Sequence, residues 1–311
     1  MALANQPGFD PNEFFKEKDY SVFINPLVES MYELGSVVKP ITIAAALNEG
    51  IIKPESTYND EGVVSMAGYT MENADGKKHG VQTMTQVLEK SLNTGAVHVS
   101  KLLGKDRQWS YFKKFGFGSK PGVDLPGEIS GNISNLDHGR EIDFATASFG
   151  HGIALTSIQL AAAIGAIANK GILMKPFIVE KIIDNSGNET VHKPEISAEV
   201  ISPETAETLT KMLVSVVKNG YDNRAGVNNY FIAGKTGTAQ IPKKDKRGYS
   251  DDVVHSFVGY APAFKPRFLV FFQLVKPQAR FAATTLPPHF KELANFILNY
   301  YEVPPDEKSV H

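Results

Sequence analysis

A serine and a lysine three residues apart are the first residues in this chain that could do chemistry together. Ser36 is followed by two valines and then by Lys39, and an apolar run from 40 to 47 comes next. This pattern predicts a buried helix with both side chains on one face of its first turn, where they can touch. A serine hydroxyl is a poor nucleophile until a neighbouring base takes its proton. Ser36 is therefore a candidate nucleophile and Lys39 its candidate base.

That role places a condition on the pKa of Lys39. The pKa must fall from about 10.4 toward about 7, which costs roughly 5 kcal/mol and is within reach of burial plus a nearby cation. By itself a Ser-x-x-Lys pattern is usually an ordinary helix surface, so the chemistry needs support from other parts of the chain.

A second group of polar side chains lies between two expected helices. Thr83 and Gln86 form the pattern of a capping box that opens a helix over 83–90, and a further helix is expected over 94–103. Ser91 and Asn93 lie at the junction, where a hydroxyl and an amide two residues apart can both face a cleft. Taken alone, this is an everyday helix junction with Asn93 as an N-cap.

A third group interrupts an apolar strand that is expected over 230–240. Lys235, Thr236, Gly237 and Thr238 follow one another there, and a glycine inside a strand often marks close approach by a ligand or another backbone. Alternation along the strand puts Lys235 and Gly237 on one face and the two threonines on the other. Taken alone, the lysine could simply protect an edge strand from aggregation.

The order Ser-x-x-Lys, Ser-x-Asn, Lys-Thr-Gly is that of penicillin-binding proteins and class A β-lactamases. Each piece also has the expected context of helix start, helix junction and strand. The chain resembles the transpeptidase domain of class B penicillin-binding proteins, of the septal and elongation types. The resemblance covers nearly the whole chain and extends to segments 32–36, 115–118, 122–128, 149–153 and 257–262.

The resemblance implies a reaction on peptidoglycan stem peptides that end in D-Ala-D-Ala. Ser36 would attack the carbonyl between the two D-alanines, and Lys39 would take its proton. Ser91 would pass a proton to the departing D-alanine, while Asn93 would hold the substrate amide and orient Lys39. Lys235 would lower the pKa of Lys39 and attract the substrate carboxylate.

The same resemblance assigns substrate binding to Thr236, Gly237 and Thr238, with the Thr238 hydroxyl favoured over that of Thr236 as a direct contact. The backbone N–H groups of Ser36 and Thr238 would form the oxyanion hole. An amine from a neighbouring stem peptide would resolve the acyl-enzyme and form a cross-link, and a β-lactam would acylate Ser36. No metal or organic cofactor is expected.

The resemblance also implies a setting in the cell. The longer parent protein would be anchored at the outer face of the bacterial cytoplasmic membrane and would work with a glycosyltransferase and other cell-wall assembly proteins. The membrane anchor, the non-catalytic pedestal domain and most of the first sheet strand of such a parent are expected to be absent from this sequence.

Two other functions remain open at this point. One is a serine hydrolase of the same fold, either a β-lactamase or a D,D-carboxypeptidase, and Glu128 and Asn132 have the spacing of a deacylating loop. The other is a non-catalytic sensor of β-lactams or peptidoglycan that is acylated and stops. The three motifs do not separate these readings, because all of them share the acylation machinery.

Composition excludes several other classes of protein. The chain has 311 residues, 42% of them hydrophobic and 21% charged, with a net charge of -2. This balance gives no reason to expect nucleic acid as a partner, and the one basic run, 243–247, is interrupted by an acid. The absence of cysteine excludes disulfides and thiolate metal sites, and no apolar run is long enough to span a bilayer.

The element pattern predicts an α+β chain of the β-lactamase/transpeptidase-like class. A single domain over 1–311 would combine a sheet lobe, about 1–35 and 175–311, with a mostly helical lobe, about 36–174. Further helices are expected over 156–169 and from 202 to before 220, and antiparallel strands over 230–240, 253–263 and 267–276. A turn at 185–188 should join two short strands. A last helix, about 288–301, should bury Phe290, Leu293, Phe296, Ile297 and Tyr300.

Overall fold

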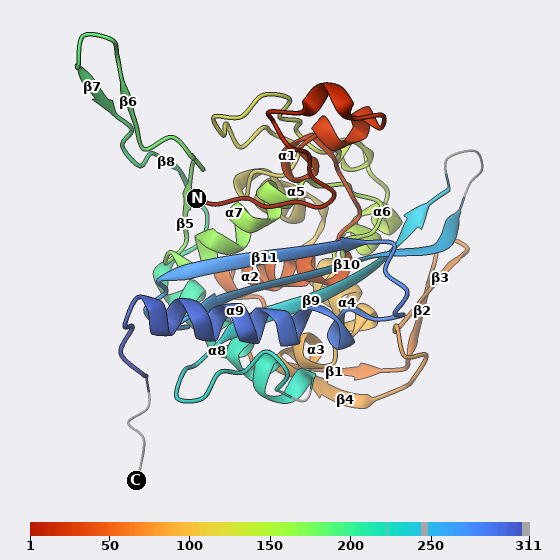
Figure 1. Cartoon of the computed structure of the whole chain (residues 1–311). Helices are drawn as coiled ribbons and strands as arrows, with labels where there is room; N and C mark the ends of the chain where they lie inside the picture. The colour runs from red at the N-terminus through yellow and green to blue at the C-terminus, as the bar shows by residue number, and fades with distance from the viewer. Residues whose placement is uncertain (222, 244–247, 307–311) are drawn as a thin grey trace.

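A three-stranded antiparallel sheet lies at the centre of the molecule (Figure 1). The computed structural model describes residues 1–221, 223–243 and 248–306. The strand order is β11-β10-β9, with β9 at Ala233–Pro242, β10 at Tyr249–Ala261 and β11 at Phe268–Val275. The expected antiparallel meander is confirmed, while residues 244–247 of the basic run lie outside the described residues.

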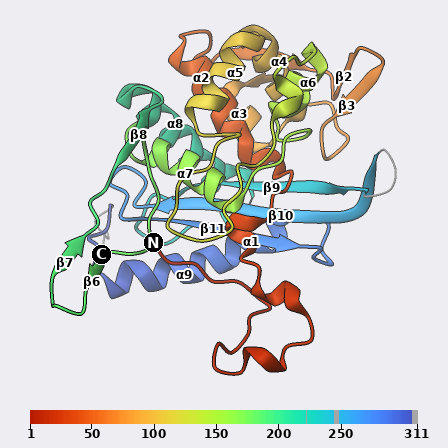
Figure 2. The ribbon, with the colours of Figure 1, turned by 90° about the horizontal axis from the view of Figure 1, so that it is seen from above.

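Helices cover both faces of this sheet, as Figure 2 shows from above. Helix α9 (Leu286–Tyr300) packs against β10 and β11 from one side, and α7 (Ser157–Ala168) and α8 (Pro203–Ser215) pack from the other. The Phe290 ring lies 5.0 Å from the Phe257 ring, centroid to centroid. A Cβ atom on Gly259 would come within 2.8 Å of the Phe290 ring, so the glycine makes room for the helix. The predicted α+β fold, a sheet flanked by helices, is confirmed.

The expected buried face of α9 is wrong at two positions. Phe296 is 63% exposed and Tyr300 is 69% exposed, and their rings stack on each other in solvent. The fully buried side chains recur every fourth residue instead, at Phe290, Ala294 and Leu298. Spacing on the helix decides which face is inward, and the sequence prediction gave too much weight to the size of the aromatic side chains.

The remaining α-helices come from the first half of the chain. Their bounds are α1 (Pro26–Glu29), α2 (Lys39–Asn48), α3 (Met84–Glu89), α4 (Asn93–Leu103), α5 (Lys105–Lys114) and α6 (Glu141–Ala147). The predicted capping boxes at Thr83 and Thr156 are both formed, at the starts of α3 and α7. Helix α2 is buried from its first residue through Ala46, as expected for a central helix.

In the described part of the chain, four two-stranded sheets accompany the central one. They pair β1 (Thr57–Asp60) with β4 (Gly80–Thr83), β2 (Val63–Met66) with β3 (Tyr69–Glu72), β5 (Ile172–Met174) with β8 (Ile196–Glu199), and β6 (Lys181–Ile183) with β7 (Glu189–Val191). The hairpin expected around 185–188 is confirmed in β6 and β7, which project from the body of the molecule in Figure 1. The strands β1 to β4 were not predicted, because strands of only four residues carry little periodic signal.

Within the described part of the chain, no helix combines the length and apolar character needed to cross a lipid bilayer.

Candidate active site

The turn that carries Ser36 differs from the expected α-helical one. Residues Gly35–Val38 form a 3₁₀ turn, and α2 begins only at Lys39. In a 3₁₀ turn residues three apart lie directly above one another, so this geometry stacks Ser36 over Lys39 more closely than an α-helix would. Ser36 is half-buried and lines a cleft, whereas Lys39 is completely buried beneath it.

Strand β9 packs its backbone directly against this turn. A Cβ atom on Gly35, which has a φ of +65°, would lie 2.7 Å from the carbonyl oxygen of Thr238. A Cβ atom on Gly237 would collide with the carbonyl oxygen of Leu34. The two glycines thus allow the backbone around Ser36 and the backbone around Thr238 to lie side by side, as an oxyanion hole made from their N–H groups requires.

We expect Gly237→Ala to damage both stability and acylation. The new methyl group has no room beside Leu34, so β9 must shift away from the Ser36 turn, at a cost of about 1–3 kcal/mol in the free energy of unfolding. Acylation by a penicillin should fall at least about tenfold if the backbone N–H of Thr238 serves as an oxyanion-hole donor, because that N–H then moves. Thermal unfolding and acylation kinetics would measure the two effects.

The matched control is Gly165→Ala on α7, where an added Cβ atom would meet no atom within 4 Å. This variant should gain about 0.5–1 kcal/mol from helix propensity and keep its acylation rate. Equal rates in the two variants would contradict a role for the close contact at Gly237.

Ser91 joins the two buried lysines. Lys39 Nζ donates to the Ser91 carbonyl oxygen at 2.5 Å, lies 3.3 Å from its hydroxyl, and donates to Asn93 Oδ1 at 2.8 Å. Lys235 Nζ reaches the same hydroxyl at 2.9 Å and the Thr236 carbonyl oxygen at 3.1 Å. Ser91 has a φ of +56°, a left-handed conformation that non-glycine residues rarely adopt and that is typical of functional sites.

Burial controls the charges of this cluster. It lowers the pKa of Lys39 well below the ordinary lysine value, and the charge of Lys235 lowers it further. Burial also lowers the pKa of Lys235, to about 7. The pKa of His151, which lines the cleft, falls to about 4, through burial and then through the charge of Lys39. The arrangement therefore favours a neutral Lys39 that can accept a proton.

The strand motif divides as alternation predicts. Lys235 and Gly237 face Ser91 and the Ser36 turn, and the Thr238 hydroxyl accepts from the backbone N–H of Ala282 at 3.0 Å on the other side. Thr238 still lines the cleft, and Thr236 is not among the residues that line it in the described part of the chain.

The cleft above these groups has a volume of about 880 Å³, within the range of small-molecule and peptide sites. Ser36, Asn93 and Thr238 line it together, although they lie far apart in the sequence. Sequence reasoning missed most of its outer wall, which is built from strands, loops and the start of α6 without a shared motif: Tyr69, Glu72, Arg140, Asp143, Tyr249, Asp251, Arg280 and Phe281.

A family comparison identifies the kind of domain that holds this cleft. Residues 1–295 match the family described as the penicillin binding protein transpeptidase domain. The chain belongs to this transpeptidase family.

The sequence is also similar to individual proteins of known function. The chain is 37% identical to stage V sporulation protein D of Bacillus subtilis, over 93% of this chain and 45% of that protein. It is 28% identical to the peptidoglycan D,D-transpeptidase FtsI of Escherichia coli, over 98% of this chain and 50% of that protein. The chain thus spans about half the length of the curated relatives it matches.

A solved structure agrees with the fold. The crystal structure of penicillin-binding protein 3 from Mycobacterium tuberculosis in complex with aztreonam superimposes with a TM-score of 0.84 at 32% identity. The match covers 91% of this chain and 66% of that chain. The predicted family and fold class are therefore confirmed.

Within residues 1–221, 223–243 and 248–306, no group of three or more histidine and carboxylate side chains could hold a metal ion.

Proposed function

We propose that this chain is the catalytic domain of a peptidoglycan D,D-transpeptidase that forms an acyl-enzyme on Ser36. The observation that carries the proposal is the Ser91 hydroxyl, which lies within hydrogen-bonding distance of two buried lysines, one of them three residues after the half-buried serine of the cleft. Burial that lowers the pKa of an amine makes it a better base for a neighbouring serine hydroxyl.

Acylation would proceed in two steps, formation of a tetrahedral intermediate and its collapse. The Ser36 hydroxyl oxygen attacks the carbonyl carbon between the terminal D-alanines while its proton passes to Lys39 Nζ. The backbone N–H groups of Ser36 and Thr238 stabilise the negative oxygen of the tetrahedral intermediate. The C–N bond then breaks as Ser91 gives its proton to the departing D-alanine nitrogen and recovers one from Lys39. An acceptor amine from another stem peptide attacks the ester, which restores Ser36 and forms the cross-link.

Substrate binding would use the remaining motif residues. Lys235 and the hydroxyls of Thr238 and Thr236 attract the terminal carboxylate, with Thr238 better placed because it lines the cleft. Asn93 holds the substrate amide, and the backbone of Gly237 lets the substrate lie close to β9. β-Lactams would acylate the same serine.

The candidate residues for hydrolysis, Glu128 and Asn132, make other contacts in this structure. The Glu128 carboxylate accepts from the backbone N–H groups of Gly122 at 2.9 Å and Val123 at 3.0 Å, which closes a turn. Asn132 Oδ1 accepts from the N–H of Ser134 at 3.0 Å. Neither side chain is among the described residues that line the cleft, so neither is positioned to activate a deacylating water.

The proposal extends to organisation and location. Residues 1–311 would form one transpeptidase domain with the two lobes given above, within a longer protein that is anchored at the outer face of the bacterial cytoplasmic membrane. Its partners there would be peptidoglycan strands, a glycosyltransferase and other cell-wall assembly proteins.

Acylation is expected to follow a bell-shaped pH profile. The rate should rise with pH as Lys39 loses its proton, because its lowered pKa sets the acid limb. The rate should then fall through about pH 7 as Lys235, whose pKa burial lowers to about 7, loses the charge that attracts the carboxylate. The measurement is the second-order rate constant for a fluorescent penicillin between about pH 5 and about pH 9.

The matched variant for this profile is Lys235→Ala. It should react more slowly and lose the alkaline limb. A wild-type rate that continues to rise above about pH 8 would contradict the proposed role of the Lys235 charge.

Intact-protein mass spectrometry with benzylpenicillin tests the function itself. We expect a lasting adduct on Ser36, and rapid return to the free mass would instead indicate a β-lactamase. Release of D-alanine from a stem-peptide analogue, measured with and without an acceptor amine, then separates the remaining possibilities. Transfer to the amine supports the transpeptidase, transfer to water a carboxypeptidase, and no release a sensor.

A further inference from the structure

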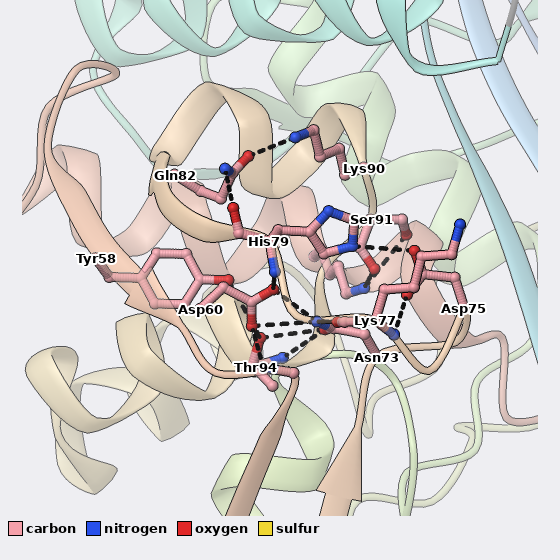
Figure 3. Close-up of polar contacts among 12 residues, drawn as sticks. Tyr58, Asp60, Asn73, Asp75, Lys77, His79, Gln82, Lys90, Ser91 and Thr94 are labelled. Carbon is pink, nitrogen blue, oxygen red and sulfur yellow. Dashed lines mark hydrogen bonds and ion pairs between the residues drawn. The ribbon is translucent and has the colours of Figure 1, made fainter.

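A buried carboxylate lies beneath the Ser91 to Asn93 junction. Asp60, at the end of β1, has no exposed surface and is surrounded by hydrogen-bond donors (Figure 3). Its Oδ1 atom accepts from the Thr94 hydroxyl at 2.6 Å and from the Gly62 N–H at 3.0 Å. Its Oδ2 atom accepts from Asn73 Nδ2 at 2.9 Å and from the His79 N–H at 3.1 Å.

The hydrogen bonds balance the cost of burying this charge. Burial alone would raise the pKa of Asp60, but the bonds from Thr94, Gly62, Asn73 and His79 leave the pKa below the ordinary aspartate value. The carboxylate is therefore ionised at neutral pH. A buried anion with every donor aimed at it fixes the positions of those donors, because moving any of them leaves part of the charge unsatisfied.

Two of the donors belong to segments that hold Asn93. Thr94 directly follows Asn93 in the first turn of α4, where the N-cap residue, Leu92, makes no side-chain cap. Asn73, the residue after β3, supplies that cap instead, because its Oδ1 atom accepts from the Thr94 N–H at 3.3 Å. A tertiary contact thus fixes the start of α4, and a negative charge near a helix N-terminus is favourable.

A second connection between Asp60 and Asn93 passes through Glu72, the neighbour of Asn73. Its carbonyl oxygen, one residue before Asn73, accepts from Asn93 Nδ2 at 2.8 Å. That bond turns the opposite side of the amide, Oδ1, toward Lys39 Nζ at 2.8 Å. The orientation of Asn93, and with it one of the three contacts of Lys39, therefore depends on β3 and α4 being held together.

We propose that Asp60 is a positioning residue for acylation, acting through Asn73 and Thr94 to hold Asn93 against Lys39. The inference rests on the proposed function for the role of Lys39. Asp60 itself touches neither the cleft nor Lys39 in the described structure.

The first test compares a charge change with a shape-conserving change. Asp60→Asn places an NH₂ group among donors, and Thr94→Val removes the hydroxyl without altering any charge. Both should lower the second-order rate constant for acylation by a penicillin about tenfold. Because Thr94→Val changes no charge, a shared loss is positional and not Coulombic. Thr94→Ser keeps the hydroxyl and should keep the rate.

Ser100→Ala is the control for general destabilisation. Ser100 lies on the same helix, is buried, and donates to Gln108 at 2.6 Å, far from the start of α4. Removing its hydroxyl should lower the melting temperature about as much as Thr94→Val does and leave the acylation rate within about twofold of wild type. Equal loss of rate in Ser100→Ala would overturn the proposal, as would an unchanged rate in Thr94→Val.

A double-mutant cycle identifies the route. If Asp60 acts through Asn93, Asp60→Asn should change the rate less than about twofold in an Asn93→Ala background, while its effect on melting temperature persists. A full tenfold loss in that background would show that Asp60 acts by another route, and would also overturn the proposal.

An NMR titration that does not depend on acylation tests the positioning role of Asp60 separately from the proposed function. The titration of Lys39, followed by NMR of ¹³C-labelled lysine and assigned with Lys39→Met, should shift in Thr94→Val and stay in place in Ser100→Ala. If the wild-type protein forms no penicillin adduct, the proposed function fails, and the lysine titration still decides whether Asp60 positions Asn93. An unshifted Lys39 in Thr94→Val would reject the positioning role.

Discussion

The Ser36→Ala variant is expected to form no covalent adduct with benzylpenicillin. The substitution removes the only atom that the proposed mechanism joins to the acyl group, so the loss should be complete and not partial. Ser36 is half-buried and loses one oxygen atom, so the free energy of unfolding should change by less than about 0.5 kcal/mol. Intact mass after incubation and a thermal melt would measure the two quantities.

Ser186→Ala provides the comparison. Ser186 lies in the exposed turn of the β6–β7 hairpin, so its variant should be acylated like the wild type. An adduct that persists in Ser36→Ala would mean that another residue is the nucleophile, and peptide mapping of that adduct would identify it.

Lys39→Met is expected to slow acylation about a thousandfold, because general-base catalysis contributes about 10²–10⁴ to such reactions. Methionine is nearly as long and keeps the site filled. The adduct should still form slowly on Ser36, unlike in Ser36→Ala. Time-resolved mass spectrometry would measure the rate.

The same variant should change how stability depends on pH. The folded-state pKa of Lys39 is lowered below its unfolded value, so between these two pKa values the unfolded chain binds one proton more than the folded chain. The free energy of unfolding then rises with pH by about 1.4 kcal/mol per unit from this group. Lys39→Met removes that contribution, so its slope against pH should be lower than that of the wild type by this amount.

Lys211→Met is the matched control, because Lys211 is an exposed side chain paired with Glu207 on α8. Its acylation rate should equal that of the wild type. A Lys39→Met protein that keeps the wild-type slope would show that Lys39 has an ordinary pKa, and the proposed base would then lack its physical basis.

Local spacing carried much of the information about the site. Ser36 and Lys39 are three residues apart, so any helical first turn places them together, whether it is the expected α turn or the observed 3₁₀ turn. The capping boxes at Thr83 and Thr156 fixed the starts of α3 and α7 for the same reason. Alternation in β9 correctly put Lys235 and Gly237 on one face, because the strand period does not depend on its neighbours.

Sequence patterns gave wrong predictions where the packing of one element on another decides which residues are buried or paired. The aromatic residues Phe296 and Tyr300 on α9 were expected to be buried, but the sheet accepts the face that carries Ala294, which lets the helix approach closely. The strands β1 to β4 were missed because each is only four residues long, and their pairing depends on tertiary contacts.

By itself, then, the sequence determined the family, the three motif groups, the central meander and the candidate nucleophile, because these depend on residue type and on spacing within single elements. Only the tertiary structure decided that one serine hydroxyl meets two buried amines, that Asp60 and Asn73 hold the start of α4, and that Arg140 and Tyr249 wall the cleft. These features join residues that are tens of positions or more apart. Their energies come from burial and from donor–acceptor geometry, which exist only once the chain has folded.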